Sequence, residues 1–189
     1  LANFSAVKGV PFYFILHYES LWTRYKMRAV KTYDFPMKKL VLSNWLKDTL
    51  KKNHGQNADV FVTPVDQDMF FCSEKKWNLT RRVCMLHHDY GWKGYEDGIK
   101  AVKEVIARGY DLQLVVFGEK LEDPQQLFDA AGFDFEYHYR PARERLRKIY
   151  TSCDIFLCPS WYEGLGMTAM EAMACRCSLV TADTGGCLD

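Results

Sequence analysis

Short, nearly continuous apolar runs recur along the chain, and amphipathic stretches separate most of them. The runs are residues 11–17, 38–43, 58–64, 81–87, 112–118, 134–138, 153–159 and 177–182. Runs of this length are typical of strands that are covered on both faces, as in parallel sheets. Because alternating strands and helices are joined by crossover connections, the sequence predicts an α/β fold of parallel sheets with helices on both faces.

Two stretches between the apolar runs have the periodicity of helices that pack on a sheet. Residues 94–110 carry an apolar stripe with lysine and glutamate opposite, and Gly109 follows as a stop signal. The predicted stripe consists of Ile99, Val102, Val105 and Ile106. Residues 142–152 offer a second apolar face, formed by Leu146, Ile149 and Tyr150.

The alternation is interrupted once, over residues 62–82, which are rich in turn formers and charges and have no clear period. Such a segment is usually a linker or a functional loop. The sequence therefore predicts the end of an N-terminal domain over residues 1–64, an interdomain linker over 65–80 and an incomplete second domain over 81–189. The start at Leu1 rather than Met, and the end just after a glycine turn, indicate a piece of a longer protein.

The composition narrows the classes of function. The chain has 48% hydrophobic residues, and its 25 Lys and Arg residues nearly balance its 24 Asp and Glu residues, for a net charge of +1. No overall field would draw it to nucleic acid or to an anionic membrane, so binding must come from local sites. We expect a cytoplasmic chain, because it has no apolar run long enough to span a membrane and no signal sequence in its first thirty residues.

The seven cysteines are odd in number and irregularly spaced, which favours free thiols in a reducing compartment. The spacing of Cys175 and Cys177 is not that of a zinc knuckle, and His87 and His88 lie far away in the sequence. The sequence therefore predicts no metal site.

The stretch from Glu163 to Glu171 places two carboxylates around a predicted helix start near Leu165–Met167. In a parallel sheet this turn lies at the carboxyl edge, where ligands bind, and the helix start favours phosphate. The helical rise between the glutamates is at most ~12 Å, which suits a sugar diphosphate with one carboxylate for each sugar ring. The spacing alone also allows an acidic residue near a helix start and a solvated helix position.

Further residues point to a family. Residues 146–186, which include PSWYEGLGMTAMEAMA, resemble the donor-binding segment of retaining nucleotide-sugar glycosyltransferases of the group 1 or family 4 type, with its E-x7-E element. Residues 91–119 resemble the first strand and helix unit of the C-terminal domain in these enzymes, and 41–70 resemble the end of the N-terminal domain with its linker. The resemblance implies a GT-B architecture of two Rossmann-like domains, here truncated at both ends.

The resemblance also implies roles for individual residues. Lys93 would bind the donor diphosphate, Glu163 would hold the transferred sugar, and Glu171 would hold the ribose, with Glu163 and Lys93 as the catalytic residues. The loop over 139–143 would lie near the base. The implied donor-binding set is His88, Lys93, Gly94, Arg140, Ser160, Glu163, Gly164, Leu165, Gly166, Met167 and Glu171.

The chain departs from the family pattern at two places. His88 occupies the position of a phosphate-binding arginine, which raises the alternative of weak donor binding or of an inactive relative. Arg176 and Ser178 stand where glycine and proline are common. If Arg176 adopts the left-handed conformation at a helix end, it costs on the order of 1 kcal/mol relative to glycine.

The expected activity is transfer of a sugar from a nucleoside diphosphate, such as a UDP-, GDP- or dTDP-sugar, to a hydroxyl group with retention of configuration and without a cofactor. The expected acceptor is a glycan or a lipid-linked glycan of surface polysaccharide assembly. Peripheral membrane association, at the inner face, would come through the missing N-terminal domain. The alternatives are a sugar-nucleotide epimerase of the same architecture and a non-catalytic nucleotide-binding module. A response-regulator-like or flavodoxin-like domain would explain the alternation but not the clustered motifs.

Overall fold

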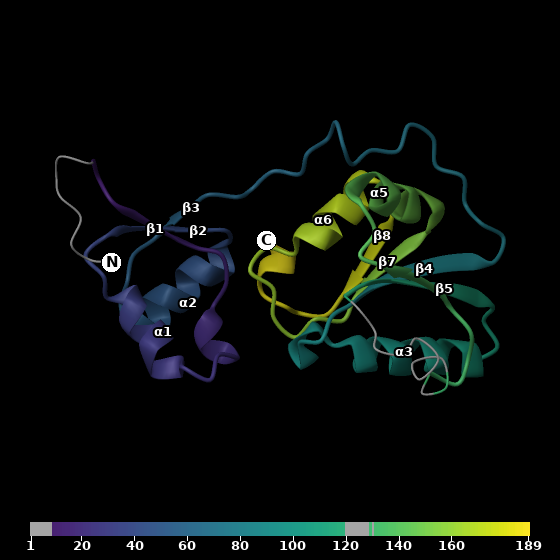
Figure 1. Ribbon diagram of the computed structural model, residues 1–189, viewed down its shortest axis with the longest axis horizontal. Coiled ribbons are helices and arrows are strands. Elements are labelled where there is room, and N and C mark those ends of the chain that lie inside the picture. Colours follow the sequence, from purple (N-terminus) through teal and green to yellow (C-terminus); the bar gives the residue numbers. More distant parts are fainter. Residues whose placement is uncertain (1–8, 120–128, 130) are drawn as a thin grey trace. The chain divides into compact units, whose positions relative to one another are not determined.

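The computed structural model describes residues 9–119, 129 and 131–189, whose strands form two parallel sheets (Figure 1). The chain divides into two compact units. The first consists of Leu1–Pro64, Tyr162–Gly166 and Asp183–Asp189, and the second of Val65–Trp161 and Met167–Ala182. The α/β fold predicted from the sequence is confirmed.

The first unit is built on three parallel strands in the order β1-β2-β3. The strands are β1 (Phe12–Ile15), β2 (Lys38–Val41) and β3 (Asp59–Val60), and the helical segments are η2 (Glu19–Leu21), α1 (Lys26–Tyr33), α2 (Asn44–His54) and η4 (Gly186–Leu188). Helix α2 begins where the Ser43 hydroxyl accepts a hydrogen bond from Leu46 N at 3.2 Å, and it ends at Gly55.

The second unit is built on five parallel strands in the order β6-β5-β4-β7-β8. The strands are β4 (Arg81–His87), β5 (Leu112–Gly118), β6 (Glu136–Tyr139), β7 (Ile155–Cys158) and β8 (Ser178–Thr181). Its other elements are η3 (Gly91–Lys93), α3 (Tyr95–Ala107), α5 (Arg143–Ser152) and α6 (Met167–Ala174). Helix α3 covers one face of the sheet, and α5 and α6 lie on the other (Figure 1).

Each face of the five-stranded sheet has its own core. On the α3 face, Met85 and Val116 pack with Ile99 and Val102. On the α5 face, the fully buried Tyr150 makes ring contacts with Phe117, Phe156 and Phe70. Phe70 comes from the segment before β4, and this contact holds that segment on the second unit.

All eight predicted strands are present, and the three predicted helices are α3, α5 and α6. Ile99 and Val102 of the predicted stripe on α3 are buried, whereas Val105 and Ile106 are each 38% exposed. Val105 lines an apolar pocket together with Leu112, Ile155 and Val180 of the sheet, so it lies on the sheet side of α3 without being covered. No helix or strand occurs between β3 and β4, all of whose residues the structure describes. The domain limits at 64, 80 and 81 stay predictions.

The seven cysteines, all within the described part, form no disulfide, as expected from their spacing. In the same described ranges, no three His, Cys, Asp or Glu side chains are arranged to hold a metal ion. Nor does any described helix combine the length and the apolar character needed to cross a bilayer.

Candidate functional site

The strand order of the second unit defines where a ligand can bind. Strand β4 is central, and the chain continues to β5 on one side and later returns to β7 on the other. The order of the strands therefore reverses between β4 and β7, and in open parallel sheets ligands bind at such a point, beyond the carboxyl ends of the strands. The two segments that leave this point are the β4–α3 loop and the start of the β7–α6 loop.

Gly94 joins these two loops. Its φ of 68° is in the left-handed region, and a Cβ built on it would lie 2.0 Å from the carbonyl oxygen of Pro159. Only glycine allows the two backbones to approach this closely. Trp161 N also donates a 2.8 Å hydrogen bond to the carbonyl of Trp92. The loops thus form one rigid edge.

Predicted phosphate ligands lie at both ends of an aromatic stack on the β4–α3 loop. The His88 ring stacks on Tyr90 with centroids 4.4 Å apart, and Tyr90 stacks on Trp92 at 5.7 Å. Lys93 Nζ lies 4.5 Å from the centroid of the Trp92 ring. This His88–Tyr90–Trp92–Lys93 arrangement, called the aromatic ladder below, was not foreseen from the sequence, because it depends on the turn η3.

The position of the proton on His88 follows from the same loop. His88 Nδ1 accepts a hydrogen bond from the backbone N–H of Tyr90 at 3.2 Å. A neutral imidazole whose Nδ1 accepts must carry its proton on Nε2. His88 can therefore donate a hydrogen bond to an anionic oxygen in its neutral form, although it lacks the permanent charge of the arginine that it replaces.

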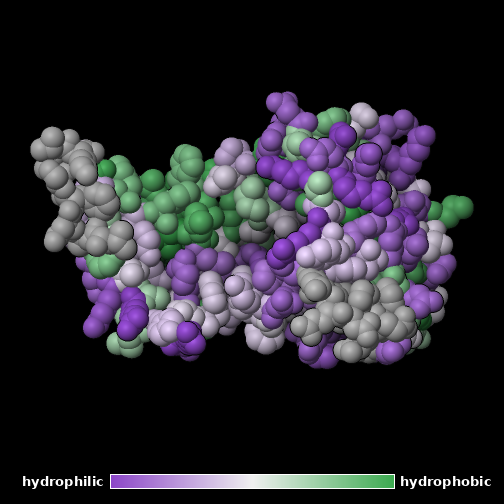
Figure 2. Space-filling model, in the orientation of Figure 1, coloured by the Kyte–Doolittle hydropathy of each residue, from purple (hydrophilic) through white to green (hydrophobic). Residues whose placement is uncertain are grey.

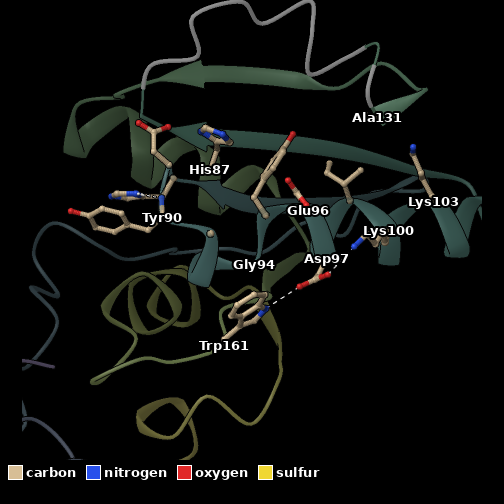
Figure 3. A pocket seen from close by; sticks show the side chains of 14 residues that line it. His87, Tyr90, Gly94, Glu96, Asp97, Lys100, Lys103, Ala131 and Trp161 are labelled. Atoms are coloured by element: carbon tan, nitrogen blue, oxygen red, sulfur yellow. Dashed lines mark hydrogen bonds and ion pairs between the residues drawn. The ribbon is translucent and has the colours of Figure 1, made fainter. Parts of the chain in front are cut away.

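A cavity of about 640 Å³ opens beside this loop, on the α3 side (Figure 3). His88, Gly94 and Trp161 are among its lining residues, whereas Lys93 is not. The Trp161 indole donates to Asp97 at 2.9 Å, and Asp97 in turn pairs with Lys100 at 3.2 Å. Asp97 was missed by the sequence reasoning, because it reads as an ordinary acidic residue in the first turn of a helix.

His87 also lines this cavity and was considered in the sequence only as a metal ligand. It is buried, and its ring meets that of Tyr95 edge to face at 4.7 Å. Burial lowers the pKa of His87. His87 Nδ1 and the Tyr95 hydroxyl are both buried without a hydrogen-bond partner among the described residues, so this part of the cavity offers polar atoms to water or to a ligand.

Glu171 is half-buried on α6, in the second unit. The Tyr150 hydroxyl donates to its Oε2 at 3.4 Å. Burial raises the pKa of Glu171, while the Arg143 guanidinium and the Tyr150 hydroxyl oppose the rise. α6 begins at Met167, within the range predicted for the helix start.

Of the other predicted residues of the second unit, Arg140 lies next to the edge strand, whereas Ser160 lies between Pro159 and Trp161, which contact the β4–α3 loop. Arg140 follows β6, the edge strand, with a φ of 37°, and its Nε donates to Glu119 at 3.0 Å. Ser160 is buried and accepts from Cys158 Sγ at 3.8 Å. The structure thus brings His88, Lys93 and Gly94 together.

The predicted residues 163–166 belong to the first unit. Glu163 is buried, its N–H donates to Thr184 O at 2.9 Å, and its carbonyl accepts from Gly186 N at 3.0 Å. A Cβ on Gly164 would lie 2.1 Å from the carbonyl oxygen of Leu16, so this position also requires glycine. Leu165 is buried, and Gly166 has a φ of 77°.

Comparison with known proteins places these features in a family. The model of the family "Glycosyl transferases group 1" matches residues 73–189. The N,N'-diacetylbacillosaminyl-diphospho-undecaprenol alpha-1,3-N-acetylgalactosaminyltransferase of Campylobacter jejuni is 38% identical over 136 residues, which are 69% of this chain and 34% of that protein. The D-inositol 3-phosphate glycosyltransferase of Rhodococcus erythropolis is 34% identical over 99 residues, 47% of this chain and 22% of that protein. The chain thus spans about a third or less of these curated relatives.

Solved structures share the fold. Alr3699/HepE of Anabaena, solved with UDP-glucose, has a TM-score of 0.75 at 18% identity and covers 94% of this chain and 55% of its own. Sucrose-phosphate synthase of Thermosynechococcus elongatus has a TM-score of 0.69 at 18% identity, covering 87% of this chain and 45% of its own. Both are GT-B glycosyltransferases, so the fold is of this type. With most of its length matched by the family model, the chain belongs to the group 1 glycosyl transferases.

Proposed function

We propose that the chain is the donor-binding part of a glycosyltransferase that moves a hexose-type sugar from a nucleoside diphosphate to a hydroxyl group, with retention of anomeric configuration. The observation that carries the proposal is the aromatic ladder beside Gly94, because it groups His88 and Lys93, the two predicted phosphate ligands, at the point where the strand order reverses. Membership of the family and the UDP-glucose bound by the Anabaena protein support it.

Lys93 and His88 act on the leaving group in this proposal. As the bond to the sugar breaks, negative charge builds on the diphosphate oxygens. The Lys93 ammonium provides a full positive charge, and His88 Nε2–H provides a hydrogen bond. Because the ladder fixes both side chains before the donor arrives, little reorganisation is needed in the transition state. We propose that these groups neutralise the charge without a metal or another cofactor.

The two glutamates bind hydroxyl groups. Glu163 orients the transferred sugar, with the backbone of residues 164–166, and Glu171 accepts hydrogen bonds from the ribose. Ser160 and Met167 flank this segment, and Arg140 lies toward the base. A carboxylate discriminates for vicinal hydroxyls, because it accepts two hydrogen bonds and donates none when ionised. The raised pKa of Glu171 makes ribose binding dependent on pH.

The acceptor is assigned by analogy with the relatives. The Campylobacter relative is named for an acceptor on diphospho-undecaprenol. We propose a glycan or lipid-linked glycan of a surface polysaccharide, elongated in the cytoplasm at the inner face of a membrane. The absence of a disulfide among the seven cysteines, all in the described part of the chain, fits a reducing compartment. An epimerase or a non-catalytic binding module would share the donor site but lack this acceptor.

Calorimetric titration with UDP, GDP, dTDP and ADP tests the donor site. We expect one nucleotide to bind, and Lys93→Ala and Glu171→Ala each to weaken it about tenfold or more. The matched control is Lys47→Ala, an exposed lysine of α2, which should bind as the wild type does. A folded chain that binds none of the four nucleotides, or binds one equally in all variants, contradicts the proposal. Release of the nucleoside diphosphate only when an acceptor is added then separates transfer from epimerisation.

A further inference from the structure

Basic side chains are concentrated in two short segments of the second unit. Residues 74–82 and 140–148 hold nine of the 25 lysines and arginines of the chain but only two of its 24 acidic residues. The net charge of the whole chain is only +1, so the rest of the chain is acidic on balance. The positive charge is therefore local.

The structure places the two segments side by side. Lys75 Nζ donates to the carbonyl of Thr151 at 3.3 Å, and Asn78 Nδ2 donates to that of Ser152 at 3.1 Å. These bonds fix the segment before β4 along the end of α5. Lys76 and Trp77, which lie between the two anchors, are exposed. The basic residues are thus held in place rather than carried on a free loop.

A cavity of about 720 Å³ lies between the two segments. Lys76, Arg145 and Lys148 are among its lining residues, and none has a carboxylate partner in the part of the chain that the structure describes. The other charges of the lining largely cancel: Arg82 pairs with Glu136 at 2.8 Å, and Glu74 adds one negative charge. The cavity retains an excess of positive charge, which suits a phosphate group.

Exposed apolar side chains border the cavity. Trp77 is 57% exposed, and Leu79 is fully exposed. Lys76, Trp77, Leu79, Arg81, Arg145 and Lys148 are called the docking surface here. Figure 2 shows that the surface over α5 and its surroundings is largely hydrophilic. Tryptophan and leucine among basic residues are the composition of surfaces that enter the headgroup region of a bilayer.

We propose that the docking surface binds the surface of a membrane that contains anionic phospholipids. The cavity receives a lipid phosphate, and Trp77 and Leu79 enter the interfacial layer. Nucleic acid is a poorer partner, because base binding to single strands uses free aromatic faces. Lys75 and Arg81 lie 5.6 and 5.9 Å from the centroid of the Trp77 ring, and Arg147 lies 4.5 Å from that of Phe71. Membrane binding by the docking surface does not depend on sugar transfer.

Co-sedimentation with vesicles tests this inference. The chain is mixed with vesicles of phosphatidylcholine alone, or of phosphatidylcholine and phosphatidylglycerol, at low and high salt. We expect binding to the anionic vesicles only, and weaker binding at high salt, since exposed charges are screened within about 10 Å at 0.1 M. Absence of binding to anionic vesicles at low salt, or equal binding to both compositions, overturns the proposal.

Two charge-matched variants locate the surface. Lys76→Glu/Arg145→Glu/Lys148→Glu should lower the partition coefficient roughly a hundredfold or more, given the contribution of each basic residue near an anionic leaflet. Lys31→Glu/Lys47→Glu/Lys52→Glu, with three exposed lysines of α1 and α2, should change it less than about threefold. If both triple variants lower the partition coefficient equally, the attraction is a general effect of charge and not of the docking surface, and the proposal is refuted. Circular dichroism confirms that both variants are folded.

Trp77→Ser and two soluble competitors complete the test. Loss of the indole should weaken vesicle binding several-fold without changing its dependence on salt, because apolar contact is not screened. Glycerol phosphate should compete only weakly. If glycerol phosphate at low concentration displaces all of the protein from the vesicles, the surface is a site for a free phosphate ester instead. If the protein binds an RNA oligonucleotide more tightly than vesicles, the surface binds nucleic acid. Either result contradicts the membrane assignment.

Discussion

The phenol of Tyr150 and the carboxylate of Glu171 are joined across α5 and α6 by a hydrogen bond of 3.4 Å. Tyr150 is fully buried and held on three sides by Phe117, Phe156 and Phe70, so its hydroxyl has a fixed position. Glu171 is only half-buried and has two oxygens. Tyr150 binds one of them, Oε2, and leaves the other for a ligand. Tyr150 is therefore a positioning residue for the proposed ribose contact.

Tyr150→Phe removes this hydrogen bond with little change in shape. We expect the affinity for the preferred nucleotide to fall about fivefold, the value of a hydrogen bond of about 1 kcal/mol. The same change should leave the affinity for the 2′,3′-dideoxy nucleotide unaltered, because that ligand has no hydroxyl for Glu171. Calorimetric titration with both ligands measures the difference.

Tyr110→Phe is the matched control, because Tyr110 is 67% exposed and lies outside the site. Equal weakening of both ligands by Tyr150→Phe would mean that the residue acts only through stability. If Glu171→Gln also weakens both ligands equally, Glu171 does not bind the ribose. The second variant thus shows whether the role of Tyr150 or that of Glu171 is wrong.

Glu171→Gln should stabilise the fold while it weakens nucleotide binding. Burial raises the pKa of Glu171, so the ionised form is less favourable in the folded than in the unfolded chain. Stability is therefore lost as the pH rises through the unfolded and then the folded pKa, and the neutral glutamine avoids the loss. We expect a gain of about 0.5 kcal/mol at pH 7, small because solvent screens a half-exposed group. Thermal unfolding at pH 7 and well below the normal glutamate pKa checks this.

The difference between the variants should vanish at the lower pH, where both side chains are neutral. In the wild type, nucleotide affinity should fall as the pH drops through the raised pKa, earlier than for an ordinary glutamate. If Glu171→Gln stabilises the fold by the same amount at the lower pH, the stabilisation is not electrostatic.

Substitutions of His88 test whether a neutral imidazole is enough to bind the donor diphosphate at the position of the family arginine. His88→Ala should weaken nucleoside diphosphate binding about tenfold or more, since it removes one hydrogen bond to a charged group. His88→Arg should strengthen it, because the guanidinium adds a permanent charge and a second donor. Titration with the diphosphate and with the nucleoside lacking phosphates separates the contributions. Weaker binding by the arginine variant would show that His88 does not face the diphosphate.

The sequence was sufficient for elements whose signal is local. The runs at 81–87 and 112–118 match β4 and β5 at both ends, because long apolar runs between charges or turn residues leave little choice of limits. Gly109 ends α3 with a φ of 86°, as expected of a glycine after the last helical turn. The helix start at Met167 was also within its predicted range.

Contacts between distant segments could not be predicted in the same way. The Tyr150–Glu171 bond depends on how α5 packs on α6, and neither residue is unusual in its own segment. The aromatic ladder needs the turn at η3, which brings side chains two residues apart into a stack. The exposure of Val105 and Ile106 could not be predicted either, because periodicity shows which face of a helix is apolar but not how closely other elements cover it.

Gly94→Ala should disrupt the edge at the strand-order reversal. The new Cβ would lie 2.0 Å from Pro159 O, and the φ of 68° is unfavourable for alanine. We expect a loss of more than about 2 kcal/mol in unfolding free energy, with loss of nucleotide binding. Gly109→Ala is the control for φ alone, because its φ is 86° and nothing lies within 4 Å of the built Cβ. It should cost about 1 kcal/mol. Denaturant unfolding compares the unfolding free energies of the two variants. Equal losses would show that a small shift of the backbone removes the clash with Pro159 at little cost.

Arg176→Gly should stabilise the second unit. Arg176 has a φ of 63° at the end of α6, where its N–H donates to Met173 O at 2.8 Å and Cys177 N donates to Ala172 O at 2.9 Å. Glycine adopts this left-handed helix end without the steric cost of a Cβ, so we expect a gain of about 1 kcal/mol. Arg108→Gly is the matched substitution at the end of α3, where φ is −80°. It should destabilise by about the same amount, because glycine there only adds freedom to the unfolded chain. Denaturant unfolding measures the change in unfolding free energy of both variants. Changes of opposite sign would assign the effect to backbone conformation, whereas changes of the same sign would assign it to the lost arginine charge.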